Sequence, residues 1–190
     1  MKRIAALILS LCLLLTVTSA FAEVAAVETA TFDAFSFTPW TGSYLEKGDP
    51  STGILFQCYP YYADGDTGSS IMAMILGGLP MDLVDMSEQD KTEFVEGMTS
   101  GVTSTFTAQG MTVTDTQVTW HDPVEADGKT GIYFDFRIDV RYFGIDISVF
   151  ESAVGFYLNG DGYMFVSGGT AQEDATRIME EFLATLTWNK

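Results

Sequence analysis

The chain has a single histidine, which limits the acid–base and metal chemistry open to it. His121 lies in Trp120-His121-Asp122-Pro123, where a predicted strand ends and a loop begins. Metal sites with paired imidazoles are excluded, and any Ser-His-Asp arrangement has to use this residue. The sequence contains no G-x-S-x-G nucleophile elbow, so a surface histidine is favoured over a catalytic one.

Cys58 is the second candidate for nucleophilic chemistry. It shares the predicted strand phase of Ile54 and Phe56, which are both apolar. This pattern predicts a buried, unreactive thiol. A nucleophile pair of Cys58 with His121 is the alternative.

The acidic segment Asp64-Gly-Asp-Thr-Gly68 begins like a calcium loop. An EF-hand needs an oxygen ligand at the fifth position and a glutamate at the twelfth, and these positions hold Gly68 and Ile75. An acidic turn is therefore predicted, and neither a metal nor any other cofactor is expected. Carboxylates are abundant, so a glycosidase-type pair stays open, but no two of them stand out.

Methionines and aromatic residues suggest two kinds of binding surface. Four methionines within residues 70–86 could line a pliable groove for an apolar ligand or fill the core: Met72, Met74, Met81 and Met86. Four aromatic residues form the candidate binding site for a peptide, glycan or protein: Trp40, Tyr59, Tyr61 and Tyr62. The alternative is that a helix covers these aromatic residues.

The first half of the chain mixes strand and helix patterns. Ser87 and Asp90 resemble a capping box, and Phe94, Met98, Val102 and Phe106 recur at every fourth position, which predicts a helix up to Gly110. The other predicted elements are a strand at 31–37, turns at 40–50, a strand at 54–62 and a short buried helix at 70–76.

From residue 111 onward, apolar residues recur at every second position instead of every third or fourth, as in β-strands. Strands are predicted at 111–120, 133–142, 145–158 with a bulge near Val149-Phe150, and 163–166. Asn159-Gly160-Asp161-Gly162 predicts a hairpin turn, and a loop is expected at 122–128. Thr170 and Glu173 form a predicted capping box before a final helix with the apolar stripe Ala175, Ile178, Met179, Phe182, Leu183 and Leu186. Segregated strands and helices predict an α+β domain, an antiparallel sheet covered by helices.

The first 22 residues have the pattern of a cleavable signal peptide. A basic Lys2-Arg3 precedes an uncharged apolar run of about fourteen residues, which is shorter than a membrane span, and Ala20-Phe21-Ala22 fits a cleavage site. We therefore expect a signal peptide at 1–22, a flexible leader at 23–30, a single domain at 31–190 and a secreted or periplasmic location. No integral membrane segment is expected after cleavage.

Cleavage would leave seven basic and twenty-six acidic residues, a net charge of −19. Such a surface repels nucleic acid, so nucleic-acid binding is excluded. Only Cys58 would remain of the two cysteines, so the domain has no intrachain disulfide and depends on its core.

The order of elements, with the early Phe35-Ser-Phe-Thr-Pro-Trp40 and the amphipathic helix after Tyr163–Val166, resembles the PsbP/Mog1-like α/β/α sandwich group. This resemblance implies such a sandwich over most of residues 31–188. It also implies a non-catalytic accessory or binding role, as for members that serve a photosystem or a small GTPase. No partner-contacting motif of these members matches here.

Together these patterns lead us to expect an exported, non-catalytic binding or accessory protein with an unknown protein, peptide or glycan partner. Two alternatives stay open: an extracellular hydrolase that uses carboxylates, and a carrier of an apolar ligand.

Overall fold

The computed structural model describes residues 29–189 apart from 50–52, 62–63, 66–67 and 78–81. The predicted signal peptide and most of the predicted leader lie outside these residues. The elements are β1 (Ala30–Thr31), β2 (Phe35–Phe37), β3 (Tyr44–Lys47), β4 (Ile54–Tyr59), β5 (Ser70–Leu76), the 3-10 turn η4 (Leu83–Asp85), α2 (Glu88–Ala108), β6 (Thr112–Trp120), β7 (Val124–Ala126), β8 (Lys129–Tyr142), β9 (Ile145–Leu158), β10 (Asp161–Gly169), α3 (Gln172–Leu183) and β11 (Thr187–Trp188).

A large antiparallel sheet runs through the centre of the structure. Its strand order is β3-β4-β5-β10-β9-β8-β6, and β7 pairs with β8 beside this path. The long hairpins β8–β9 and β9–β10 form its middle, joined by turns at Phe143-Gly144 and Asn159-Gly160, all four with positive φ. The predicted α+β class is confirmed.

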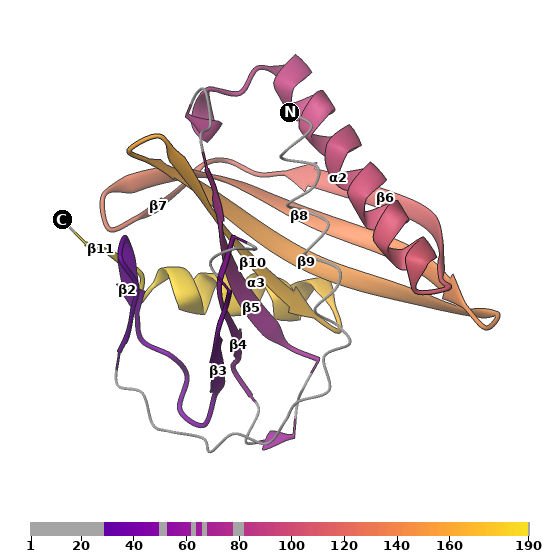
Figure 1. Ribbon diagram of the computed structural model, residues 1–190, viewed down its shortest axis with the longest axis horizontal. Helices are drawn as coiled ribbons and strands as arrows, with labels where there is room; N and C mark the ends of the chain where they lie inside the picture. Colours follow the sequence, from indigo (N-terminus) through magenta and orange to yellow (C-terminus); the bar gives the residue numbers. More distant parts are fainter. Residues whose placement is uncertain (1–28, 50–52, 62–63, 66–67, 78–81, 190) are drawn as a thin grey trace.

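The two helices cover opposite faces of this sheet (Figure 1). The α2 face buries alternate residues of the central strands, including Met74, Phe134 and Met164. The α3 face buries the residues between them, including Phe156 and Phe165. Because neighbouring strand residues point to opposite faces, strands with both faces covered are apolar along most of their length.

A three-stranded sheet, β1-β2-β11, joins the two ends of the domain. This small sheet belongs to the core of the α3 face. There Phe35 and Phe37 contact Phe56. Trp188 packs against the same core. The predicted strand at 31–37 is thus two short strands, and β1 begins at Ala30.

Local signals placed α2 correctly. Ser87 is the N-cap, its Oγ accepts from the Asp90 backbone N–H, and the Asp90 carboxylate accepts from the Ser87 backbone N–H. The stripe Phe94, Met98, Val102 and Phe106 is buried as predicted. Across the residues that the structure describes, no helix is both long and apolar enough to cross a membrane.

The helix predicted at 70–76 is wrong, because this segment is β5. The run Ser-Ile-Met-Ala-Met-Ile-Leu is apolar at almost every position, so its periodicity does not separate a buried helix from a buried strand. Hydrogen-bonded pairing with β4 and β10 makes this segment a strand, and neither partner lies within the segment itself.

Several smaller predictions are also corrected. No bulge lies near Val149-Phe150, where β9 pairs with β8 in regular register; the burial pattern changes there because β9 leaves the exposed hairpin end and enters the core. A bulge in β4 instead turns Ile54 to the α2 face, away from Phe56 and Cys58. The N-cap of α3 is Ala171 and makes no side-chain cap bond. Strands β3 and β7 occupy parts of the segments predicted as turn and loop.

Candidate functional site

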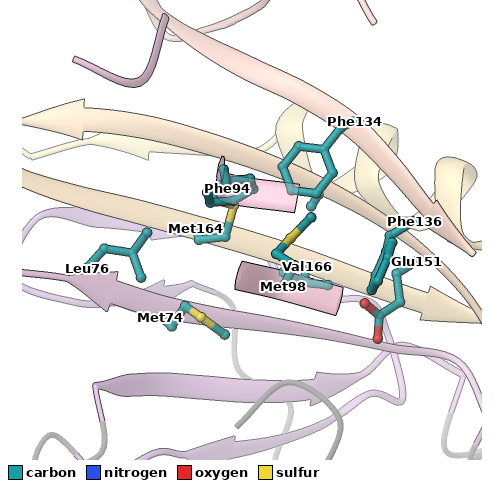
Figure 2. Close-up of a pocket in the computed structure, with 10 residues that line it drawn as sticks. Met74, Leu76, Phe94, Met98, Phe134, Phe136, Glu151, Met164 and Val166 are labelled. Atoms are coloured by element: carbon teal, nitrogen blue, oxygen red, sulfur yellow. The ribbon is translucent and has the colours of Figure 1, made fainter. Parts of the chain in front are cut away.

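A small cavity lies between α2 and the sheet (Figure 2). Its volume is about 20 Å³. Four strands and the helix supply its walls: Met74 and Leu76 from β5, Phe94 and Met98 from α2, Phe134 and Phe136 from β8, Glu151 and Ala153 from β9, and Met164 and Val166 from β10. Glu151 is the one polar side chain in this lining.

The Glu151 carboxyl lies at one end of the cavity, beside Phe136 (Figure 2). The residue is 6% exposed, and its Oε2 atom is enclosed without a hydrogen-bond partner in the described part of the chain. Burial raises the pKa of Glu151 to about 8. A buried acid in this state favours its neutral form, because desolvation disfavours the carboxylate.

The core of the α2 face holds more methionines than the sequence indicated. Met72 and Met74 of the predicted groove lie in the core of the α2 face, and Met86 packs against it. Met81 lies outside the described residues. Met98 and Met164, which are far apart in the sequence, join them.

The end of the β8–β9 hairpin is the second unusual feature, at the right edge of Figure 1. Four large apolar side chains are exposed there: Tyr142 (38%), Phe143 (88%), Ile145 (64%) and Ile147 (42%). Phe143 also has a φ of 48°, and Gly144 has a φ of 81°. Positive φ at both turn positions favours Asn-Gly, and a bulky aromatic residue at the first position is strained.

The hairpin end has one apolar and one charged face. Tyr142 lies opposite Ile145, and Val140, which α2 buries, lies opposite Ile147. These residues therefore continue the apolar α2 face beyond the cover of the helix. On the other face Arg141 binds Asp146 at 2.7 Å, which satisfies both charges.

The predicted aromatic site is divided by the structure. Tyr61 and Trp40 lie against α3, where Trp40 Nε1 donates to Glu181 Oε2 at 2.6 Å and Tyr61 Oη donates to the same oxygen at 3.1 Å. The Arg177 guanidinium lies 4.9 Å from the centre of the Tyr61 ring and hydrogen-bonds its hydroxyl. The helix thus engages both rings, which was the alternative interpretation.

Tyr59 is the last residue of β4, next to the edge strand β3, and it points away from the face that holds Cys58 and α3. Its ring stacks on Tyr44 with centroids 6.1 Å apart, on the neighbouring strand β3. Tyr62 lies outside the described residues. The structure therefore does not bring Tyr59 together with Trp40 and Tyr61 into one surface.

His121 is on the surface, as predicted. Its Nε2 lies 2.8 Å from Asp135 Oδ2, and Ser152 Oγ donates to Asp135 Oδ1 at 2.7 Å. The aspartate thus stands between the serine and the histidine. A catalytic triad needs the serine bonded to the histidine, so this group does not have that arrangement.

Cys58 is fully buried, which confirms the predicted environment of the thiol. It lies on β4, whereas His121 follows β6 at the other side of the sheet, so the nucleophile pair is wrong. Burial raises the pKa of Cys58 to about 12, despite a hydrogen bond with Ser43 that acts in the opposite direction.

We expect native Cys58 to resist a thiol reagent such as DTNB at pH 8 and to react fully in denaturant. The thiolate is the reactive form, and both its raised pKa and its burial suppress it. The measurement is the absorbance change with and without urea, on protein with Cys12 changed to Ala. Fast labelling of the native protein would contradict the buried position.

The segment predicted as an acidic turn is only partly described, because Asp66 lies outside the described residues. Among those residues that the structure does place, no group of three or more His, Cys, Asp or Glu side chains is arranged to hold a metal ion.

Several solved structures have a fold similar to that of this chain. The solution structure of cyanobacterial PsbP (CyanoP) from Synechocystis sp. PCC 6803 matches with a TM-score of 0.54 and covers 90% of this chain and 98% of that chain. The chain has a PsbP-like fold. The identity is 10%, so the match concerns the PsbP-like fold alone. No protein-family model and no curated protein matches the chain.

Proposed function

We propose that this protein is an exported, non-catalytic binding protein whose β8–β9 hairpin end docks into an apolar groove of a protein partner. The observation that carries the proposal is the exposure of Tyr142, Phe143, Ile145 and Ile147 together. Contiguous exposed apolar side chains on a soluble protein mark interaction sites, and large aromatic and aliphatic anchors dominate such interfaces.

The charges favour a protein partner over an anionic membrane surface. The chain has a net charge of −17, which repels anionic lipid headgroups at long range. The neutralised Arg141–Asp146 pair on the opposite face stays in water, so the hairpin offers one apolar face to a groove. A groove bordered by basic side chains complements both the apolar face and the acidic surface of the domain.

Export is the part of the proposal that rests on sequence. Its support is the signal-peptide pattern of residues 1–22.

The two alternative functions gain less support. A carboxylate hydrolase needs two carboxyls in one cleft, and Glu151 is the only carboxyl that lines the cavity described above. A carrier of a drug-sized apolar ligand needs a pocket of roughly 300 Å³ or more. The cavity of about 20 Å³ is far smaller.

A double variant, Phe143→Asn with Ile145→Thr, tests the docking surface. Asn-Gly suits this turn, so the fold should be retained. Wild type and variant are immobilised and exposed to the secreted and envelope proteins of the producing cell, and captured proteins are quantified by mass spectrometry. We expect one partner to be captured at least about tenfold less by the variant, since loss of a main interface anchor costs roughly 2 kcal/mol or more and each 1.4 kcal/mol is a factor of about ten.

Tyr59→Ser provides the matched control, because it removes an aromatic residue of the originally predicted site. It should capture the same protein as wild type. A photo-reactive benzoyl-phenylalanine at position 143 should then cross-link that protein directly. Equal capture by wild type and the hairpin variant, or loss only with Tyr59→Ser, would show that the hairpin is not the docking surface.

A further inference from the structure

Glu151 and the helix α2 form an arrangement that the proposed docking function does not use. The carboxyl of Glu151 faces the cavity between α2 and the sheet, and the other side chains of the lining are apolar (Figure 2). Its Oε2 atom is enclosed and has no hydrogen-bond partner in the described part of the chain. Helix α2 contributes Phe94 and Met98 to the lining, so it is one of the walls that keep water from the carboxyl.

The walls that belong to the sheet are fixed by backbone hydrogen bonds. Strand β9 lies between β8 and β10 and pairs with both in regular register, with Glu151 opposite Phe136 on one side and Gly168 on the other. Strand β10 in turn pairs with β5 along most of its length. Moving one of these strands would break a ladder of backbone hydrogen bonds, which is costly where the freed groups stay buried.

Helix α2 is held in a different way. It packs on the sheet through apolar side chains: Phe94, Met98, Val102 and Phe106. Five of its twenty-one residues are threonine and two are glycine, which have low helix propensity, so the helix depends on this packing. The core of the α3 face lies on the other side of the sheet and shares no residue with the core beneath α2. Of the walls of the cavity, α2 is therefore the one that can separate at the least cost.

We propose that α2 is a pH-sensitive cover: ionisation of Glu151 favours a state in which α2 has separated from the sheet and water reaches the carboxylate, while the rest of the fold persists. An enclosed carboxylate without a partner is unfavourable, and contact with water removes this penalty. Separation of α2 also uncovers the apolar face of β8 and β9, which continues into the exposed Ile145 and Ile147 of the hairpin end. The cover thus controls how much apolar surface the protein presents.

The direction of the pH effect follows from the protonation of Glu151 in the two states. Burial raises the pKa of Glu151 from 4.5 to about 8 in the closed state, and water restores the ordinary pKa in the open state. Between these two pH values the closed state holds a proton that the open state releases, so opening increases as the pH rises. Below pH 4.5 the closed state has its full advantage. Above pH 8 the carboxyl is ionised in both states, so the change levels off.

Among the described residues, the elements around the carboxyl direct no charged side chain at it. Helix α2 and strands β5, β8 and β10 contribute apolar side chains alone to the lining. On β8, Arg137 follows Phe136 and points to the opposite face, where it is paired with Asp139. On α2, the basic residue Lys91 is paired with Glu88. Desolvation is accordingly the cause of the raised pKa of Glu151.

Native-state hydrogen exchange, followed by mass spectrometry at pH 5.5, 6, 6.5 and 7, tests the cover, with each rate corrected for the intrinsic exchange rate at that pH. We expect the α2 amides to exchange through an opening that is at least about tenfold more frequent than global unfolding, which urea titration measures under the same conditions. This opening should become about tenfold more frequent per pH unit. The amides of α3, on the other face of the sheet, should exchange at the slower rate of global unfolding.

Two variants of the acid and one control make the assignment specific. Glu151→Gln and Glu151→Met keep a similar size without a titrating group, so the α2 opening should no longer change with pH in either. Glu96→Gln removes the same charge from an exposed position of α2 and should keep the pH dependence of wild type. Equal protection of α2 and α3 would show that the helix separates only when the whole protein unfolds, which would overturn the proposal. The same pH dependence in wild type and in both Glu151 variants would also overturn it, since another group would then control the helix.

Discussion

Between pH 4.5 and 8 the free energy of unfolding of this protein should fall by about 4 kcal/mol because of Glu151 alone. Its pKa is raised from 4.5 to about 8 in the native state by burial. Across this window the native state keeps a proton that the unfolded state has released, so stability decreases as the pH rises, by about 1.4 kcal/mol per unit. Urea unfolding at pH 5, 6, 7 and 8 measures this slope.

Glu151→Gln is the matched control, because glutamine has the size of the protonated acid and does not titrate. The variant should show a much flatter profile and should exceed the stability of wild type at pH 8. Repulsion among the many acidic residues also grows with pH, but it affects both proteins equally, so the difference between them isolates Glu151. Parallel profiles would contradict the enclosed, unpartnered position of this carboxyl.

Asp139 and Asp146 have lowered pKa values, and they affect the free energy of unfolding at more acidic pH than Glu151 does. The hydrogen bond from Ser148 lowers the pKa of Asp139, and the hydrogen bond from Arg141 lowers that of Asp146. A lowered carboxyl pKa contributes stability that is lost as the pH falls through the folded value. These groups therefore act on the acid side of the window and do not mask the decline toward pH 8.

Phe35→Ala should destabilise the protein by about 3–5 kcal/mol, the usual cost of removing a fully buried phenylalanine. Phe35 is 0% exposed and links the small sheet to the large one. Its ring centroid lies 5.1 Å from that of Phe165 and 6.1 Å from that of Trp188. The alanine variant loses these contacts and leaves a cavity between the sheets.

Urea unfolding at pH 6 measures the loss, and Phe143→Ala is the control. Phe143 has the same side chain at 88% exposure, so its removal should change stability by only about 0.5 kcal/mol. A loss below about 1 kcal/mol for Phe35→Ala would mean that the small sheet does not belong to the cooperative core.

The sequence predicted an element correctly where the residues that define it lie within one short segment. The capping box of Ser87 and Asp90 and the four-residue stripe define α2 without reference to the rest of the chain. The same holds for β8, where Phe134 and Ile138 alternate with charged residues, and for the turn at Asn159-Gly160. The buried state of Cys58 was also predictable from its apolar strand.

Local sequence failed for β5, because an apolar run that is buried on both faces has no distinguishing period. Its strand state depends on β4 and β10, which lie on either side of it in the sheet but far apart in the chain. The predicted aromatic site was divided for a similar reason. Only the packing of α3 shows that Trp40 and Tyr61 share Glu181, while Tyr59 stacks on Tyr44.

The sequence by itself thus determined the α+β class, the acidic character and the type of most elements, because alternation and capping are properties of adjacent residues. Only the tertiary structure decided which functional groups matter. Glu151 is one acid among twenty-six until the cover of α2 and the neighbouring strands removes it from water. In the sequence, the apolar residues around Phe143 look like those of any buried strand. The structure shows that they are exposed, because α2 does not extend over the hairpin end. Burial depends on which distant segments pack together.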